Sequence, residues 1–169
     1  LALRQAGQPL LQLGLVSTGR STLSVREART AGVDTYITID GLALSLREGM
    51  VVAARGPRIS LMGADVSRSA ALIRDLRPGV ADRFHSYLNG NDETVTRTYR
   101  CVVADRGPRE IRIGEDTVQT RLMAEDCRSL SDSFANLYWV LPGSGRIVQS
   151  RQWIDPETGA LSTRILPAS

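Results

Sequence analysis

The segment FANLYWVL-PGSG-RIVQSRQWI-DPETG, residues 134–159, determines much of the predicted fold. Two runs of strand-forming residues flank a Pro-Gly turn, and residues 155–159 have the composition of a second turn. Proline presets φ in such turns, and glycine accepts the positive φ that closes them. The segment therefore predicts consecutive antiparallel strands that contain both tryptophans of the chain.

Alternation of apolar and polar side chains, which is typical of strands with one buried face, continues towards the N-terminus. The pairs Asp40-Gly41 and Glu48-Gly49 separate such runs, and Asp-Gly between alternating runs is a strong hairpin signal. Residues 10–55 therefore predict an antiparallel meander. A helical period replaces the alternation between residues 65 and 76, where Asp65 or Ser67 could cap the helix start.

Further strands are predicted towards the C-terminus, at 94–104, 109–113, 118–125, 134–141, 146–154 and 160–166. About ten strands and one short helix near residues 65–76 predict a mainly β fold. We expect an antiparallel meander that curls into a barrel or a sandwich. No segment rich in Gly, Ser or Pro divides the chain, so residues 1–169 are expected to form a single β-rich domain.

One internal similarity has two interpretations. Residues 51–58 (VVAARGPR) and 102–109 (VVADRGPR) match at all but one position. They indicate either a duplicated strand-turn unit or two similar hairpin turns.

All 21 basic residues are arginine, and the net charge is +3. Guanidinium groups suit carboxylate or phosphate recognition, although a GC-rich genome would also favour arginine. The arginines are scattered and accompany no recognition motif, so no nucleic-acid partner is expected. The absence of lysine excludes Schiff-base chemistry, Ser-Lys dyads and a Walker-type phosphate site.

Cys101 and Cys127 are the only cysteines. Cys101 lies in a run whose alternate residues form a mostly apolar face, which fits either a disulfide with Cys127 or two buried thiols. We favour the disulfide, which would indicate an oxidising compartment. With His85 as the single histidine, no Cys/His zinc site is expected.

No catalytic, metal-binding or cofactor-binding residue is predicted, and no cofactor is expected. His85 lacks a neighbouring nucleophile motif and is interpreted as structural or exposed. Two carboxylate pairs, Glu125 with Asp126 and Asp155 with Glu157, could suit a glycoside hydrolase. Nothing in the sequence brings these pairs together, so we do not expect an enzyme.

A candidate binding surface is predicted on the strands of residues 134–154. Ala135, Leu137, Trp139 and Leu141 form an apolar face, so Trp139 is expected in the core and Tyr138 on the opposite face. The next strand has four polar residues in a row, which indicates a solvated strand or a cleft. The candidate surface residues are Tyr138, Gln149, Arg151 and Trp153.

The chain resembles the lipoprotein family associated with group 4 capsule and related exopolysaccharides (YjbF/GfcB-like). The most specific strings are Asn136-Leu-Tyr-Trp-Val and Ser150-Arg-Gln-Trp-Ile-Asp-Pro-Glu-Thr-Gly. Weaker ones include Asp40-Gly-Leu-Ala-Leu and Tyr99-Arg-Cys. Gly56-Pro57-Arg58-Ile59 departs from the Gly-Leu-Gly-like turn expected of the family.

The resemblance implies a secreted lipoprotein that faces the periplasm from the outer membrane, with a lipid-modified cysteine upstream of residue 1. The chain would then be the mature protein without signal peptide and lipobox. It also implies partners in polysaccharide or exopolysaccharide export, and it brings no catalytic residues. We therefore expect an accessory protein that binds glycan or an export partner. The alternatives are a glycan hydrolase or lyase, favoured by a carboxyl group with a raised pKa, and a scaffold without ligand.

Overall fold

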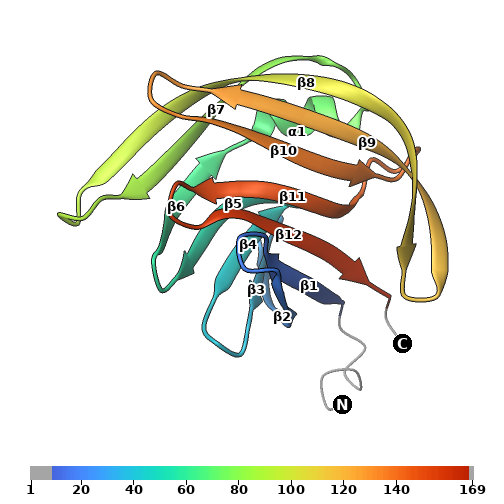
Figure 1. Cartoon of the computed structure of the whole chain (residues 1–169), viewed down its shortest axis with the longest axis horizontal. Helices are drawn as coiled ribbons and strands as arrows, with labels where there is room; N and C mark the ends of the chain where they lie inside the picture. The colour runs from blue at the N-terminus through green and yellow to red at the C-terminus, as the bar shows by residue number, and fades with distance from the viewer. Residues whose placement is uncertain (1–8, 168–169) are drawn as a thin grey trace.

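The computed structural model describes residues 9–167, which form twelve strands and one short helix (Figure 1). The elements are β1 (Leu10–Leu15), β2 (Arg20–Thr30), β3 (Val33–Ile37), β4 (Ala43–Arg47), β5 (Met50–Gly56), β6 (Ile59–Asp65), α1 (Ser67–Arg74), β7 (Gly79–Leu88), β8 (Thr94–Ile113), β9 (Asp116–Arg128), β10 (Ser133–Val140), β11 (Ile147–Asp155) and β12 (Gly159–Leu166).

The strands form a closed antiparallel barrel in which each strand pairs with its neighbours in sequence. Pairing of β1 with both β2 and β12 closes the barrel. This confirms the predicted mainly β antiparallel fold and decides between the barrel and the sandwich. Strands β6 and β7 were not predicted, while the two strands expected at 94–104 and 109–113 are one long strand, β8, with a bulge between Asp105 and Pro108.

The predicted hairpins in the N-terminal half are confirmed. β3 and β4 are joined through Asp40-Gly41, and β4 and β5 through Glu48-Gly49. Glu48 and Gly49 both have positive φ, at 53° and 87°, as a type I′ turn requires. The turn is also crowded, because a Cβ on Gly49 would lie 2.8 Å from Ile147 Cβ.

The similarity between residues 51–58 and 102–109 reflects neither of the two interpretations. The first segment lies in the β5–β6 hairpin, where Gly56 pairs with Ile59. The second lies within β8, where its Gly107 sits in the bulge and has φ of 87°. A similar string therefore forms a turn in one place and a bulged strand in the other, because the long β9 partner keeps β8 extended.

Helix α1 confirms the predicted helix and packs into the barrel beside β7, β8 and β10. Its buried residues are Ser69, Ala70 and Ile73. The N-cap position is Val66, which makes no side-chain capping bond, so neither predicted residue occupies it. Asp65, one residue earlier, accepts hydrogen bonds from the Ser67 backbone N–H at 3.0 Å and from its hydroxyl at 2.7 Å. Among residues 9–167, no helix has the length and apolar character of a membrane span.

The two ends of the barrel differ. Neighbouring strands run in opposite directions. The start of β1, the end of β12 and helix α1 therefore all lie at the same end of the barrel, here called the helix end (Figure 1). The turns after β5, β7, β9 and β11 lie at the opposite end, here called the open end.

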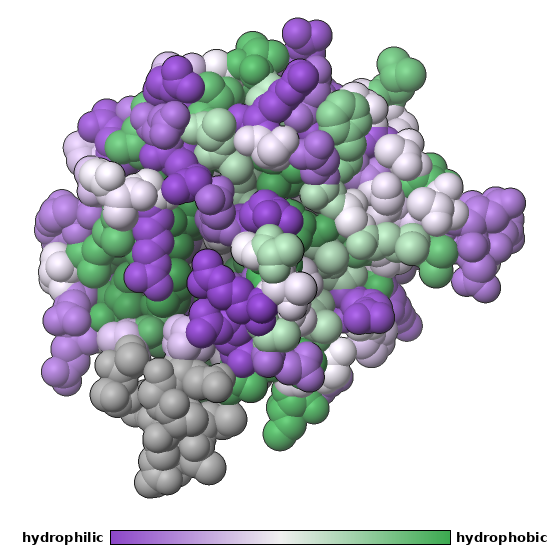
Figure 2. Space-filling view, turned by 180° about the vertical axis from the view of Figure 1, so that it is seen from behind, coloured by the Kyte–Doolittle hydropathy of each residue, from purple (hydrophilic) through white to green (hydrophobic). Residues whose placement is uncertain are grey.

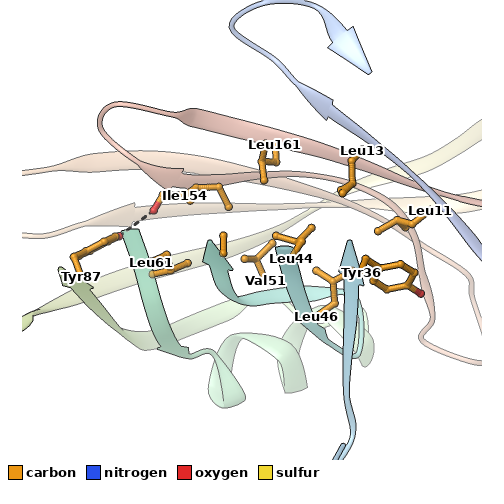
Figure 3. Packing of buried hydrophobic residues seen from close by; sticks show 11 residues of the cluster. Leu11, Leu13, Tyr36, Leu44, Leu46, Val51, Leu61, Tyr87, Ile154 and Leu161 are labelled. Atoms are coloured by element: carbon orange, nitrogen blue, oxygen red, sulfur yellow. Dashed lines mark hydrogen bonds between the residues drawn. The ribbon is translucent and has the colours of Figure 1, made fainter. Parts of the chain in front are cut away.

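The barrel is flattened, so that opposite walls touch. Figure 3 shows Ile154 and Leu161 facing Val51 across the interior, within one buried apolar cluster. A second apolar cluster joins α1 to β8, β9 and β10. Burying each such side chain contributes about 1.5–3 kcal/mol, so both clusters stabilise the contact between the barrel walls.

Gln152 of β11 bridges the two walls with its side chain. Its Oε1 accepts the Val51 N–H at 2.8 Å, and its Nε2 donates to the Gly49 carbonyl at 2.8 Å. β5 pairs with β6 only from Ala54 to Gly56, so the Gln152 amide satisfies backbone groups that no strand reaches. Ser150, also buried, bonds Thr163 at 2.6 Å. The polar run in β11 is therefore solvated only in part, since Ser150 and Gln152 lie inside the barrel while Gln149 and Arg151 face outward.

The predicted disulfide between Cys101 and Cys127 is present. The two residues are direct register partners on β8 and β9, with their Cα atoms 4.0 Å apart. Both are fully buried against Tyr99 and Phe134. The bond therefore connects adjacent strands beneath the aromatic part of the core.

Replacing both cysteines by alanine should lower the free energy of unfolding by about 3 kcal/mol, because the unfolded chain loses a loop constraint. Urea titration of Cys101→Ala/Cys127→Ala measures this loss. Wild-type protein in reductant should show a similar loss. A change below about 1 kcal/mol in both would contradict the stabilising role.

Gln152→Leu should cost about 2–4 kcal/mol, since it leaves the Val51 N–H and the Gly49 carbonyl without partners. Gln149→Leu is the matched control on the same strand. Gln149 is only half-buried, and its side chain accepts a hydrogen bond from Arg164 on the outer face of the barrel. Thermal or urea unfolding compares the two. Equal losses would show that Gln152 is not a bridge of special importance.

Candidate functional site

Strand β7 supplies the main polar residues of the barrel interior. Arg83, His85 and Tyr87 alternate along it and are all buried. On the opposite face of the strand, Phe84 and Leu88 are exposed, at 41% and 38%. This pattern inverts the usual rule of apolar inside and polar outside, which explains why the strand was not predicted. The alternation of charged and aromatic residues at positions 83, 85 and 87 was the available signal.

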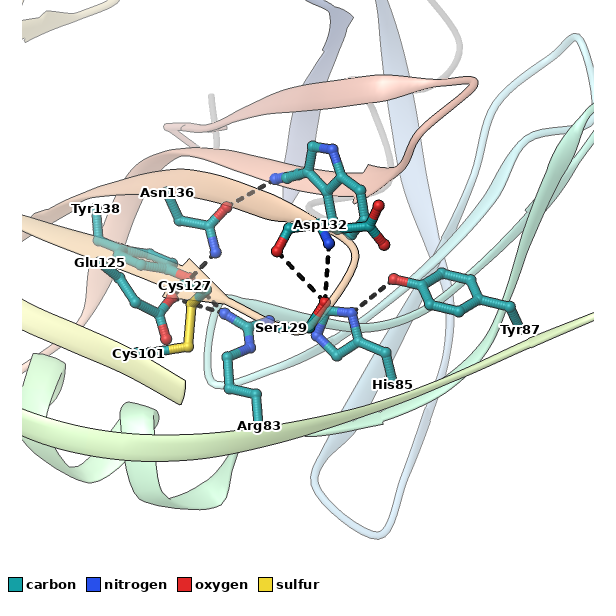
Figure 4. Close-up of a disulfide and its surroundings, with 11 residues drawn as sticks. Arg83, His85, Tyr87, Cys101, Glu125, Cys127, Ser129, Asp132, Asn136 and Tyr138 are labelled. Carbon is teal, nitrogen blue, oxygen red and sulfur yellow. Dashed lines mark hydrogen bonds and ion pairs between the residues drawn. A yellow bond between two sulfur atoms is a disulfide. The ribbon is translucent and has the colours of Figure 1, made fainter. Parts of the chain in front are cut away.

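Arg83 forms a buried ion pair with Glu125 of β9 in the barrel interior (Figure 4). Arg83 Nη1 lies 2.6 Å from Glu125 Oε2, and the side chains are 2% and 0% exposed. The same carboxylate oxygen accepts hydrogen bonds from Tyr138 at 2.9 Å and from Asn136 at 3.0 Å. Burial alone would raise the pKa of Glu125, but the Arg83 charge and these donors hold it below its usual value.

The positions of Tyr138 and Trp139 are the reverse of the prediction. Tyr138 is fully buried, so its assignment to a binding surface is wrong. Trp139 lies half-buried on the outer face of β10, so its assignment to the core is also wrong. The inward face consists of Phe134, Asn136, Tyr138 and Val140. Asn136 and Tyr138 are tolerated there because Glu125 and Arg83 satisfy them.

An aromatic cluster lies between the ion pair and the open end. Phe134 and Trp153 stack with centroids 4.5 Å apart and an interplanar angle of 4°. The His85 ring lies 4.9 Å from Tyr99 and 5.8 Å from Phe134. Four of the eight aromatic residues of the chain therefore gather around one histidine.

Hydrogen bonding determines the form of His85. The Tyr87 hydroxyl donates to the Ile154 carbonyl at 3.2 Å, so it accepts from His85 Nδ1 at 2.8 Å. Nε2 then carries a lone pair and has no partner among residues 9–167. Burial, reinforced by the Arg83 charge, lowers the pKa of His85 to about 3. His85 is therefore a neutral, structural histidine, in agreement with one of its two interpretations.

Trp153 lies where the pairing between β10 and β11 has ended. β10 and β11 pair only as far as Leu137 and Arg151 in this direction, and the Trp153 N–H is satisfied by Asn136 Oδ1 at 2.8 Å. The ring is half-buried against Phe134 and the apolar core. Trp153 and Arg151 thus do not meet as neighbours in one cleft, since Arg151 is exposed on the outer face.

Gln149 and Arg151 lie on the outer wall of the barrel, in a shallow groove of about 300 Å³. Trp139, Ser162 and Arg164 line the same groove. Arg164 donates to Gln149 at 2.7 Å. The structure therefore brings two of the four predicted surface residues together, with Trp139 in place of Trp153.

A larger cleft, of about 550 Å³, lies at the open end. The turns after β5, β7 and β11 surround it, and it is here called the mouth cleft. Its lining residues are Arg58, Ile59, Ser60, Tyr87, Leu88, Asn89, Gly90, Val95, Arg97, Asp155, Pro156 and Glu157. It thus combines an aromatic ring, apolar side chains and charges of both signs.

Two polar residues of the mouth cleft, Arg97 and Asp155, are fixed by neighbouring side chains or backbone groups. Arg97 pairs with Asp132, and its guanidinium carbon lies 5.8 Å from the centre of the Tyr87 ring. Asp155 is 4% exposed, and its Oδ1 accepts the Thr158 N–H at 2.7 Å. Sequence reasoning identified the turn at Asp155 but not the cleft, because residues from three distant hairpins form it.

Three carboxyl groups, Asp65, Asp105 and Glu125, have pKa values below their usual range, and none of them lines the mouth cleft. Burial is the largest cause that raises the pKa of Tyr87. Cys101, Glu125 and Cys127 lie within metal-ligand distance of one another. The sulfurs are joined in a disulfide and Glu125 is paired, so this group does not fit a metal.

Comparison with known proteins identifies the family. The family model described as "Group 4 capsule polysaccharide lipoprotein gfcB, YjbF" matches residues 2–166. The chain belongs to this family. Membership confirms the predicted resemblance and associates the chain with capsule polysaccharide and the cell envelope.

A solved structure supports the same fold. The chain is similar to the hypothetical lipoprotein YmcC from Escherichia coli (K12), with a TM-score of 0.83 and 15% sequence identity. The alignment covers 99% of this chain and 88% of that chain. No curated protein shows a significant match.

The low pKa of His85 predicts a specific loss of stability in acid. The unfolded chain binds a proton near pH 6.5, whereas folded His85 resists it down to about pH 3. The free energy of unfolding should therefore fall as pH drops through this window, by about 1.4 kcal/mol per pH unit from this group.

His85→Gln should remove that component. Urea unfolding of both proteins at pH 7, 6, 5 and 4 measures the difference, while Glu125 contributes to both at the acid end. Parallel pH profiles for the two proteins would contradict a buried, neutral His85.

Proposed function

We propose that this family member is a periplasm-facing accessory lipoprotein of capsule or exopolysaccharide assembly or export, and that it binds glycan in the mouth cleft without transforming it. The observation that carries the proposal is the composition of the cleft. Ile59, Leu88 and Val95 can pack against sugar rings, and Arg58 and Arg97 can hydrogen-bond hydroxyl groups.

The position of the cleft suits a tethered protein. β1 begins at the helix end, on the side opposite the mouth cleft. A lipid anchor upstream of residue 1, as the family description implies, would connect to the barrel at that end. The mouth cleft would then face away from the outer membrane, towards polymer or export proteins in the periplasm.

The rigidity of the site also supports binding. Tyr87 is held by His85 and by the Ile154 carbonyl, and the aromatic cluster packs on the disulfide. A preorganised site loses less conformational entropy when a ligand binds. A hydrolase or lyase finds less support, because the shifted carboxyl groups have lowered pKa values and His85 is neutral and enclosed.

An export-machinery partner is the second candidate, favoured by exposed apolar side chains on the outer faces of β7 and β8. Val80, Phe84, Leu88 and Val102 are 38–56% exposed, and Val80 and Val102 are register partners. Figure 2 shows one face of the molecule, on which hydrophobic and hydrophilic side chains are interspersed. The exposed strip on β7 and β8 is the more suitable surface for a protein contact.

The proposal is tested with polysaccharide purified from the producing strain and with oligosaccharides cut from it. Wild-type protein should bind in isothermal titration, and Arg58→Ala should weaken binding at least fivefold, since Arg58 is an exposed donor at the cleft rim. Arg151→Ala, on the outer groove, is the matched control and should leave binding unchanged.

Loss of binding with Arg151→Ala alone would move the site to the outer groove and overturn the mouth cleft. Absence of binding by the wild type would overturn glycan recognition. Release of shortened oligosaccharides during incubation would overturn the non-catalytic role.

A further inference from the structure

Four arginines converge at the helix end of the barrel. They line a basin of about 330 Å³, here called the helix-end basin. The arginines are Arg26, Arg29, Arg74 and Arg146, and the carboxylates that line the basin among residues 9–167 are Asp34 and Glu48. The basin therefore has a net charge of +2, whereas the whole chain has only +3.

Both carboxylates of the basin are engaged by arginine. Asp34 Oδ1 lies 3.5 Å from Arg26 Nη1 and 3.8 Å from Arg29 Nε. Glu48 Oε1 lies 2.6 Å from Arg74 Nη1. The side chains of Arg26, Arg29 and Arg74 are nevertheless 31%, 64% and 41% exposed. Such accessible ion pairs contribute little, so an incoming anion can engage the same guanidinium groups.

Arg146 adds a charge that is not compensated. It is exposed and forms no ion pair within residues 9–167. Close packing fixes its position, because a Cβ on the preceding Gly145 would lie 2.8 Å from the Arg74 carbonyl oxygen. The β10–β11 turn therefore lies against the end of α1 and holds Arg146 at the basin.

Tyr36 shows that these charges converge on one place. In Figure 3 its hydroxyl points away from the apolar cluster. Burial and the Asp34 charge raise the pKa of Tyr36. Arg26, Arg29 and Arg146 oppose that rise, so arginines from two distant parts of the chain act on the same hydroxyl.

The phosphate groups of lipids match both the charge and the location of the basin. Guanidinium groups bind phosphate oxygens in bidentate fashion. Under the proposed function, a lipid anchor connects to the barrel at the helix end, so the basin faces the membrane and the mouth cleft faces away from it. Exposed arginines are attracted to an anionic bilayer within a Debye length, which is about 8 Å at physiological salt.

We propose that the helix-end basin docks the barrel on anionic phospholipid headgroups, with Arg26, Arg29 and Arg146 contacting their phosphates. The proposal rests on the tethered orientation in the proposed function. It adds a contact that holds the mouth cleft away from the membrane surface.

Vesicle cosedimentation of residues 1–169 provides the first test. Vesicles of phosphatidylcholine alone are compared with vesicles that contain about one-third phosphatidylglycerol. The protein should bind the anionic vesicles about tenfold more tightly in about 50 mM NaCl and lose this preference in about 500 mM NaCl, because salt screens exposed charges. Equal binding to both vesicle types at low salt would overturn the proposal. If inorganic phosphate then still shifted the amide NMR signal of Arg146, the basin would be a site for free phosphate instead.

A charge-matched pair of variants provides the second test. Arg29→Gln/Arg146→Gln should weaken binding to anionic vesicles about tenfold, since each arginine near the surface contributes. The control, Arg100→Gln/Arg151→Gln, removes the same charge from exposed positions on β8 and β11 and should weaken binding by less than about threefold. Equal weakening by the two double variants would show that net charge alone acts, and would overturn the basin.

The third test asks which end of the barrel faces the membrane. A nitroxide on the lipid headgroup should broaden the amide NMR signals of Gly32 and Gly145, in turns at the helix end, more than that of Asn91 at the open end. Stronger broadening of Asn91 would overturn docking through the helix end.

Glycan titration separates this proposal from the proposed function. Arg29→Gln/Arg146→Gln should bind the producer's polysaccharide as the wild type does, because the mouth cleft lies at the other end. Absence of polysaccharide binding by a wild type that still prefers anionic vesicles would overturn glycan recognition and support docking. Polysaccharide binding without any vesicle preference would overturn docking and support glycan recognition.

Discussion

The buried ion pair between Arg83 and Glu125 is the interaction on which the barrel interior depends. Neither side chain reaches water, so each charge is compensated only by the other and by neighbouring donors. Removing one partner of such a pair typically costs about 3–5 kcal/mol. Tyr138 and Asn136 complete the set, and Asn136 extends it to the Trp153 backbone. Strands β7, β9, β10 and β11 are thereby held in one arrangement.

This arrangement supports the cleft above it. The Asn136 bond holds Trp153 against Phe134, and this stack adjoins His85, which in turn positions the Tyr87 hydroxyl. Tyr87 forms part of the mouth cleft. On the opposite wall, Gln152 joins β11 to β5, so the barrel stays flattened. The buried network of this family member thus leads up to the mouth cleft.

Much of the fold was predictable because it rests on local signals. Alternation, Asp40-Gly41 and the Pro-Gly turn identified most strands, and the disulfide was the favoured of the two interpretations of Cys101 and Cys127. Strand β7 was not predicted because its inward side chains are polar. For β10, the sequence predicted Trp139 inside and Tyr138 outside, and the structure has the reverse. Hydropathy assigns faces only when buried residues are apolar, and here an ion pair makes polar residues suitable for the interior.

The sequence alone determined that the chain forms antiparallel hairpins, where several of them turn, and which family it resembles, and it favoured a disulfide between its two cysteines. These properties depend on residues that are close in the sequence, such as turn pairs, alternating runs and short family motifs. Only the tertiary structure decided that the sheet closes, that β7 faces its charges inward, and that Arg58, Tyr87 and Asp155 surround one cleft. Those residues lie on three separate hairpins, and their proximity arises from closure of the barrel, which no local pattern records.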